Sequence, residues 1–236
     1  MTKTYTQLVP SIDRRLSTWI SMAEKSKSRE KTPAGPTITI SRQYGCEGFP
    51  LAEALKAILE EKTGEEWNIY DKALLRKVSE EEELSVRLLE GLGGPSRLLD
   101  SLPVTIPGWV PHSQMYRRLV QHLFAVAMLG RAIIIGRGGA VITQGLSNCY
   151  HFRLEASFEF RAASMGRRLG LTPPEAERHV KENQEKRDKF FSQCLNLSTS
   201  DHSFYDAVYN NERHSVNEIA WSIFGYVMKE WQGKRA

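Results

Sequence analysis

Residues 37–59 read TITISRQYGCEGFPLAEALKAIL, and this stretch decides the fold. Thr37-Ile-Thr-Ile-Ser41 is a β-branched run that predicts a strand, whereas the apolar residues of Leu51 to Leu59 recur at helical spacing. Between them lies the glycine-containing turn Arg42 to Gly48. Successive backbone N–H groups and the positive end of a helix can hold a phosphate at such a strand-loop-helix junction. A glycine loop of this kind often has only a structural role. The evidence for a phosphate site therefore comes mainly from the position of the loop between a strand and a helix.

Further short apolar runs, separated by segments of helical character, follow this unit along the chain. They are Trp67 to Tyr70, Ala132 to Gly136, Cys149 to Leu154 and Tyr205 to Tyr209. Five strands that alternate with helices predict an α/β fold of three layers, in which a five-stranded parallel sheet carries helices on both faces.

We divide the chain into an N-terminal extension, residues 1–36, and one α/β domain, residues 37–236. Apolar residues at spacings of four, three and four predict an amphipathic helix within residues 5–31, and this helix is a candidate contact for a protein partner or a second copy. Residues 72–130 form an insertion whose Gly, Pro and Trp content is typical of a cover over a site; a surface excursion without ligand contact is the alternative.

Composition sets limits on function. The net charge of +4 lies in the extension, because residues 1–32 hold seven Lys or Arg against three Asp or Glu and the other residues balance at 25 each. This pattern favours a solvated helix face over nucleic-acid binding. The three cysteines form no CxxC or Cys/His cluster, which favours reduced thiols and a cytoplasmic location. No apolar run is long enough to predict a membrane span, and the histidines form no metal-binding pattern.

The motifs together resemble the cytidylate-kinase-like family. They are, in chain order, ISRQYGxxG with its LAxxL helix, IYDK at 69–72, IIGRG at 134–138 and KRDKFF at 186–191. The resemblance implies a P-loop kinase fold related to the nucleoside-monophosphate kinases, with ATP as phosphate donor, Mg²⁺, and a cytidine monophosphate as acceptor. It also implies that Arg42 to Gly48 hold the donor phosphates and that Arg137 binds the acceptor phosphate.

The loop departs from the usual G-x-x-x-x-G-K-[ST] pattern, in which a lysine and a hydroxyl serve the phosphates and Mg²⁺. Aligned through Gly45, those two positions hold Gly48 and Pro50. The carboxylate of Glu47 repels a triphosphate unless a cation offsets it. Because phosphoryl transfer needs positioning and charge neutralisation above all, a displaced Arg42, Lys72 or Arg137 could take the place of the missing lysine.

Further candidate residues lie at the end of a predicted strand and on two helices later in the sequence. Asp71 ends a predicted strand, where it could organise Mg²⁺ or a substrate hydroxyl, or cap the next helix. The helix from Ser157 to Leu169 and the next, from Pro174 to Phe191, resemble a kinase lid whose arginines close over the phosphoryl group; solvated ion pairs along the helices are the alternative.

These expectations give a defined set of site residues. The predicted catalytic residues are Arg42, Asp71, Arg161, Arg167 and Arg187; the donor-binding residues are Arg42, Gln43, Tyr44, Gly45, Cys46, Glu47 and Gly48; the acceptor-binding residues are Asp71, Lys72, Arg137 and Asp206. No residue is assigned as a metal ligand. The expected function is phosphoryl transfer from ATP to CMP or dCMP. The alternative is a nucleotide-binding module of weak or absent catalysis with a regulatory or partner-binding role.

Overall fold

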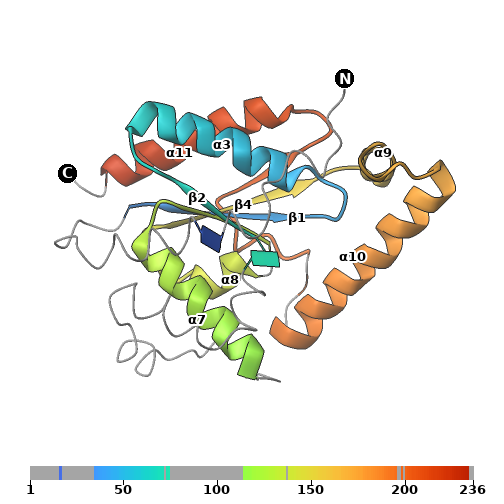
Figure 1. The fold of residues 1–236 in the computed structure, drawn as a ribbon, viewed down its shortest axis with the longest axis horizontal. Coiled ribbons are helices and arrows are strands. Elements are labelled where there is room, and N and C mark those ends of the chain that lie inside the picture. Colours follow the sequence, from blue (N-terminus) through green and yellow to red (C-terminus); the bar gives the residue numbers. More distant parts are fainter. Residues whose placement is uncertain are drawn as a thin grey trace.

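The computed structural model describes residues 16–17, 35–71, 73–74, 114–136, 138–195, 198 and 200–233. A five-stranded parallel sheet with the strand order β2-β3-β1-β4-β5 forms its centre (Figure 1). The strands are β1 (Thr37–Arg42), β2 (Asn68–Asp71), β3 (Ala132–Ile135), β4 (Cys149–Glu155) and β5 (Ala207–Asn210). The predicted α/β class and parallel sheet are therefore confirmed.

Strand β1 lies in the middle of the sheet, where it pairs with β3 on one side and β4 on the other. The register places Ile40 beside Ile135 and Arg42 beside Leu154. The carboxyl ends of the three central strands therefore meet at one edge, which is where parallel α/β sheets bind ligands. The loop that follows Arg42 emerges at the middle of this edge.

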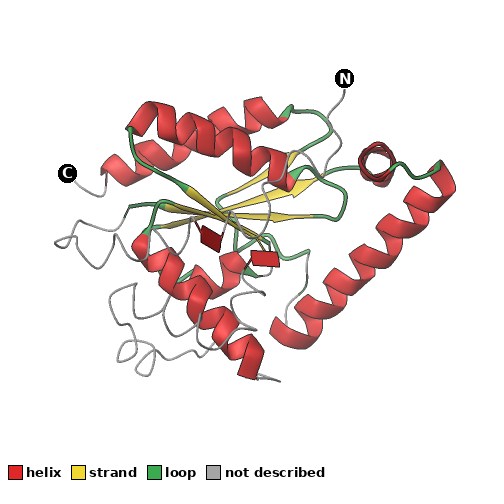
Figure 2. Ribbon diagram, viewed as in Figure 1, coloured by secondary structure: helices red, strands yellow, loops and turns green. Residues whose placement is uncertain are grey.

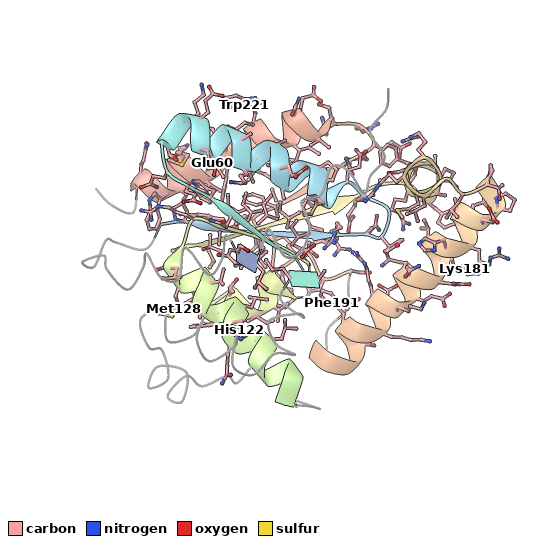
Figure 3. All side chains as sticks on the ribbon, in the orientation of Figure 1. Glu60, His122, Met128, Lys181, Phe191 and Trp221 are labelled. Carbon is pink, nitrogen blue, oxygen red and sulfur yellow. The ribbon has the colours of Figure 1, made fainter. Side chains whose placement is uncertain are left out.

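Helices cover both faces of the sheet, as Figure 2 shows. Helix α3 (Gly48–Thr63) and α11 (Val216–Gly233) pack on one face, against the buried side chains of Ile38 and Ile40. Helix α7 (Gln114–Leu129) and the short α8 (Gly139–Thr143) lie on the other. In Figure 3, Trp221 on α11 and His122 on α7 mark these opposite layers.

The apolar face of α3 explains why this segment is a helix in this place. Leu51, Leu55 and Leu59 are fully buried at intervals of four residues. Each stabilises the fold by roughly 1.5–3 kcal/mol relative to an exposed side chain. The helix ends at Gly64, which adopts the left-handed conformation at φ +67° and donates its N–H to the carbonyl of Glu60. A left-handed glycine is a common helix terminator.

Two further helices stand beyond the carboxyl edge of the sheet (Figure 1). Helix α9 (Phe158–Leu169) begins at Ser157, whose hydroxyl accepts from the Phe160 amide at 3.2 Å. Helix α10 (Pro173–Leu195) packs on α9 through a small cluster that contains Met165 and Val180. It extends four residues beyond the predicted end at Phe191. The two helices correspond to those predicted over 157–169 and 174–191, and their action as a lid stays a prediction.

Some predicted segments fall largely outside the described residues. Of the N-terminal helix, the structure describes Leu16 and Ser17, and Leu16 packs against the core cluster on the α7 side of the sheet. Of the insertion, it describes residues 73–74 and 114–130, which include α7. Among the described residues, no helix combines the length and the apolar content required to cross a membrane.

Candidate phosphate-binding loop

Residues 42–48 form the predicted turn between β1 and α3. The side chain of Arg42 extends from Gly48, at the end of this turn, to Gly136, which follows β3, because a Cβ atom at Gly48 would meet its Cδ at 2.9 Å and one at Gly136 would meet its Nη1 at 2.1 Å. Both glycines thus make room for one guanidinium at the carboxyl edge of the sheet. No larger residue fits there without moving Arg42.

Gly45 is the position at which the loop touches the lid. Its φ angle is +100°, and a Cβ atom here would lie 2.6 Å from the Cβ of Arg161 and 2.8 Å from its carbonyl oxygen. L-residues other than glycine rarely adopt such a φ angle. The conformation and the close approach to α9 both require glycine at this position.

Two lid arginines hold the loop through its carbonyl groups. Arg161, which is buried, donates from Nη1 to the Tyr44 carbonyl at 3.1 Å and from Nε to the Ala156 carbonyl at 3.2 Å. Arg187 donates from Nη1 to the Arg42 carbonyl at 2.6 Å. Its guanidinium also lies 5.2 Å from the centroid of the Tyr44 ring. Arginines from α9 and α10 therefore converge on the loop.

Tyr44 and Gln43 attach the loop to its surroundings. The Tyr44 amide donates to Gln184 Oε1 at 2.8 Å, and the Tyr44 hydroxyl lies 2.9 Å from His179 Nε2; both partners are on α10. The Gln43 amide donates to the Leu154 carbonyl, and Gln43 Oε1 accepts from the Ala156 amide, each at 3.0 Å. These two side chains therefore fix the position of the loop between β4 and α10.

The electrostatic environment of the loop is cationic. Burial raises the pKa of the Cys46 thiol to about 11, while four guanidinium groups act in the opposite direction. These belong to Arg161, Arg187, Arg153 and Arg42. Arg153 is ion-paired with Glu155, so the cationic field that attracts anions to the loop comes from the three arginines that contact it, Arg42, Arg161 and Arg187.

The Glu47 amide is engaged by another part of the chain. It donates to the side-chain oxygen of Asn211 at 2.7 Å, and the Asn211 amide donates to the Glu155 carbonyl at 2.8 Å. Asn211 is only 3% exposed. It therefore joins the turn after β5 to the residue that precedes α3, and it satisfies an amide that a bound phosphate could otherwise use.

The family model described as cytidylate kinase-like matches residues 37–213. The chain belongs to the cytidylate kinase-like family. Among solved structures, an uncharacterized protein from Eubacterium ventriosum is similar, with a TM-score of 0.61 and 18% sequence identity over 82% of this chain and 98% of that chain. At this identity the likeness shows the fold alone. No curated protein matches the chain.

The structure brings some predicted site residues together and leaves others apart. Asp71 ends β2, and its Oδ1 accepts from the Leu74 amide at 2.9 Å, which is the geometry of the capping alternative. Arg167 is exposed in the last turn of α9 and makes no contact with the loop among the described residues. Lys72 and Arg137 lie outside the described residues.

Asp206 lies away from the loop, at the amino end of β5. Its amide donates to the His151 carbonyl at 2.7 Å, and its Oδ2 accepts from the His151 amide at 2.6 Å. His151 is four residues before the end of β4 at Glu155. Asp206 is thus placed to pair the two strands, and this structure does not bring it to the carboxyl edge as the acceptor-binding prediction requires.

Sequence reasoning did not assign several residues that contact the site. The sequence pattern did not mark Gln184 and His179 as site residues, because polar residues at helical spacing usually face solvent. Asn211 does not have the left-handed conformation common for asparagine in turns, since Arg131 is the non-glycine residue with positive φ in the described part of the chain. Instead Asn210 makes the turn, since its Oδ1 accepts from the Glu212 and Arg213 amides.

No described group of three His, Cys, Asp or Glu side chains could hold a metal ion. Mg²⁺ in kinases needs no such cage, because one or two carboxylates and the substrate phosphates commonly hold it. The carboxylates at this edge include Asp71, which accepts from the Leu74 amide, Glu155, which is paired with Arg153, and Glu47, which has no ion pair with a described residue. The residues present therefore fit a nucleotide-borne Mg²⁺ better than a resident metal.

Proposed function

We propose that this protein transfers the γ-phosphoryl group of ATP to CMP or dCMP. Family membership supports a kinase-like, nucleotide-binding role, and the convergence of Arg42, Arg161 and Arg187 on the loop supports an anionic ligand at this place. This convergence is the observation on which the proposal rests, because it offers a physical replacement for the missing lysine. Charge neutralisation and positioning are the main requirements of phosphoryl transfer.

In the proposed reaction, the bond between the γ-phosphorus and the β–γ bridging oxygen breaks, and a bond forms to a phosphate oxygen of the acceptor. ADP leaves with the bridging oxygen. Mg²⁺ would neutralise charge on the β- and γ-phosphates. Arg42 and Arg187 are assigned to stabilise the developing charge, Arg161 to position the loop, and Arg137 to hold the acceptor phosphate. Closure of α9 and α10 would exclude water.

A nucleotide-binding module of weak or absent catalysis is the second candidate. The observation that favours it is the loop's reduced capacity as a donor of hydrogen bonds. Asn211 already accepts from the Glu47 amide, and Pro50 has no amide hydrogen. A phosphate that needs the Glu47 amide must displace Asn211, and this cost lowers affinity and disturbs alignment.

A coupled assay of ADP release, with ATP, Mg²⁺ and each of CMP, dCMP, UMP and AMP, tests the first candidate. Turnover is expected with the cytidine nucleotides, and Arg187→Gln should lower kcat at least about tenfold. Arg178→Gln is the matched control, since Arg178 is an exposed arginine of the same helix. Nucleotide binding without turnover for every acceptor would favour the second candidate. Neither binding nor turnover would contradict both.

A further inference from the structure

Three polar side chains from separate segments meet on the α8 side of the sheet, near its carboxyl edge. Ser41 on β1 and Arg153 on β4 are partners in the strand register. Adjacent residues in register project to the same face of a sheet, so these two side chains are neighbours. Tyr205 reaches them from the segment before β5, with its ring centroid 5.6 Å from the Arg153 guanidinium carbon.

Tyr205 contacts both of the other residues. Arg153 is 4% exposed, and its Nε donates to Glu155 Oε1 at 2.6 Å. The Arg153 guanidinium also lies against the Tyr205 ring. The Tyr205 hydroxyl donates to Ser41 Oγ at 3.1 Å.

This hydrogen bond determines what Ser41 can do. Its oxygen already accepts from Tyr205, so its own proton is available to another acceptor, and no residue in the described part of the chain takes it. A hydroxyl that accepts one hydrogen bond becomes a stronger donor, because hydrogen bonds in series polarise one another. An anionic oxygen is the acceptor that gains most from such a donor.

A crevice beside Ser41 provides the place for that acceptor. It is a narrow, partly open depression, and Ser41, Tyr205, Gly136 and Gly138 are among its lining residues. Its interior has no room for a water-sized molecule in this conformation, so a ligand must widen it. Gly136 and Gly138 flank Arg137, to which the resemblance assigns the acceptor phosphate.

We propose that the Ser41 hydroxyl binds an oxygen of the acceptor's phosphate monoester, and that Tyr205 is a positioning residue that orients this hydroxyl while Arg153 packs against the Tyr205 ring. The inference rests on the proposed function for the identity of the acceptor. The proposal adds a contact between the acceptor phosphate and β1, the strand that precedes the loop, on the face of the sheet opposite α3.

Tyr205→Phe tests the hydrogen bond from Tyr205 to Ser41, because it removes the hydroxyl group and keeps the ring. Tyr209→Phe is a matched control, since Tyr209 OH lies 2.9 Å from Ser222 Oγ at an exposed position between β5 and α11. Isothermal titration is made with CMP, with inorganic phosphate and with cytidine, which lacks the phosphate. Tyr205→Phe should weaken CMP and phosphate binding about five- to tenfold, whereas Tyr209→Phe should change it less than about twofold.

Ser41→Ala and Ser41→Thr supply a second, independent test. Ser41→Ala should weaken CMP binding about tenfold or more, and Ser41→Thr, which keeps the hydroxyl, should restore most of it. Cytidine and ATP should bind equally to all variants. The melting temperatures of Tyr205→Phe and Tyr209→Phe should agree closely, which separates a binding effect from a loss of stability.

The outcomes also separate this inference from the proposed function. Equal CMP affinity in Tyr205→Phe, Ser41→Ala and Tyr209→Phe overturns the inference while the phosphotransferase proposal stands. Wild-type protein that binds ATP but neither CMP nor phosphate overturns the inference and the assignment of the acceptor. Wild-type protein that binds none of these ligands overturns the inference and the proposed function together.

Discussion

Gly45→Ala is expected to be the most damaging small substitution in the loop. Alanine must adopt φ near +100°, and its methyl group would lie 2.6 Å from the Arg161 Cβ and 2.8 Å from the Arg161 carbonyl oxygen. The left-handed conformation costs roughly 1–2 kcal/mol for a residue other than glycine. Relief of the overlap costs roughly another 1–3 kcal/mol, because a backbone oxygen cannot rotate away.

Gly64→Ala separates these two contributions. Gly64 also has a positive φ, +67°, but an added Cβ would have no neighbour within 4 Å. This variant should therefore lose only the conformational contribution, roughly 1–2 kcal/mol. Gly45→Ala should lose roughly 2–5 kcal/mol in total and should also bind ATP more weakly, because the loop and α9 must separate.

Urea unfolding followed by circular dichroism gives the free energy of unfolding for wild type and both variants, and titration with ATP gives the affinity. Equal stability losses in Gly45→Ala and Gly64→Ala, with unchanged ATP affinity, would refute the claim that α9 packs against the loop at Gly45. A stability loss confined to Gly45→Ala with unchanged ATP affinity would instead refute the link between this packing and phosphate binding.

Three further predictions concern other contacts of the site. Asp71→Ala should lower the free energy of unfolding by about 1 kcal/mol through loss of the cap on the Leu74 amide, whereas Asp71→Asn should keep both the cap and the turnover; lost turnover in Asp71→Asn would restore Asp71 as a catalytic candidate. Burial raises the pKa of Cys46 from 9.0 to about 11, so the folded state retains a proton that the unfolded state loses. Stability should fall by roughly 2–3 kcal/mol as the pH rises from 9 to 11, and urea titrations of Cys46→Ala should show a correspondingly flatter pH dependence. Asn211→Ala should cost roughly 1–3 kcal/mol of stability by removing the acceptor of the Glu47 amide, and thermal unfolding equal to wild type would contradict this role.

The sequence was sufficient to predict the sheet and the loop because local signals and packing agree there. The β-branched run at Thr37, the periodic leucines of α3 and the glycines of the turn all indicate one structure. The lid helices were predicted for the same reason, with only the end of α10 misplaced. Phe191 is followed by four further helical residues, and helix ends are the least certain part of such a prediction.

The arrangement of side chains at the site could not be predicted in the same way. Whether Arg161 closes over a ligand or holds a carbonyl depends on how α9 packs against Gly45, and that distance is not encoded in helical spacing. Asp206 is the second residue of the predicted strand Tyr205 to Tyr209, and in the structure it lies just before β5, beside His151. The strand prediction alone therefore already placed Asp206 at the amino end, away from the acceptor site assigned to it.

The central claim is that arginines from the lid compensate for the absent lysine in binding nucleotide phosphate. Isothermal titration of ATP with Mg²⁺ into wild type, Arg187→Gln and Arg178→Gln tests it most directly. We predict saturable binding to wild type and Arg178→Gln and at least about tenfold weaker binding to Arg187→Gln. Absence of ATP binding to wild type, or equal affinity in all three proteins, would contradict the claim.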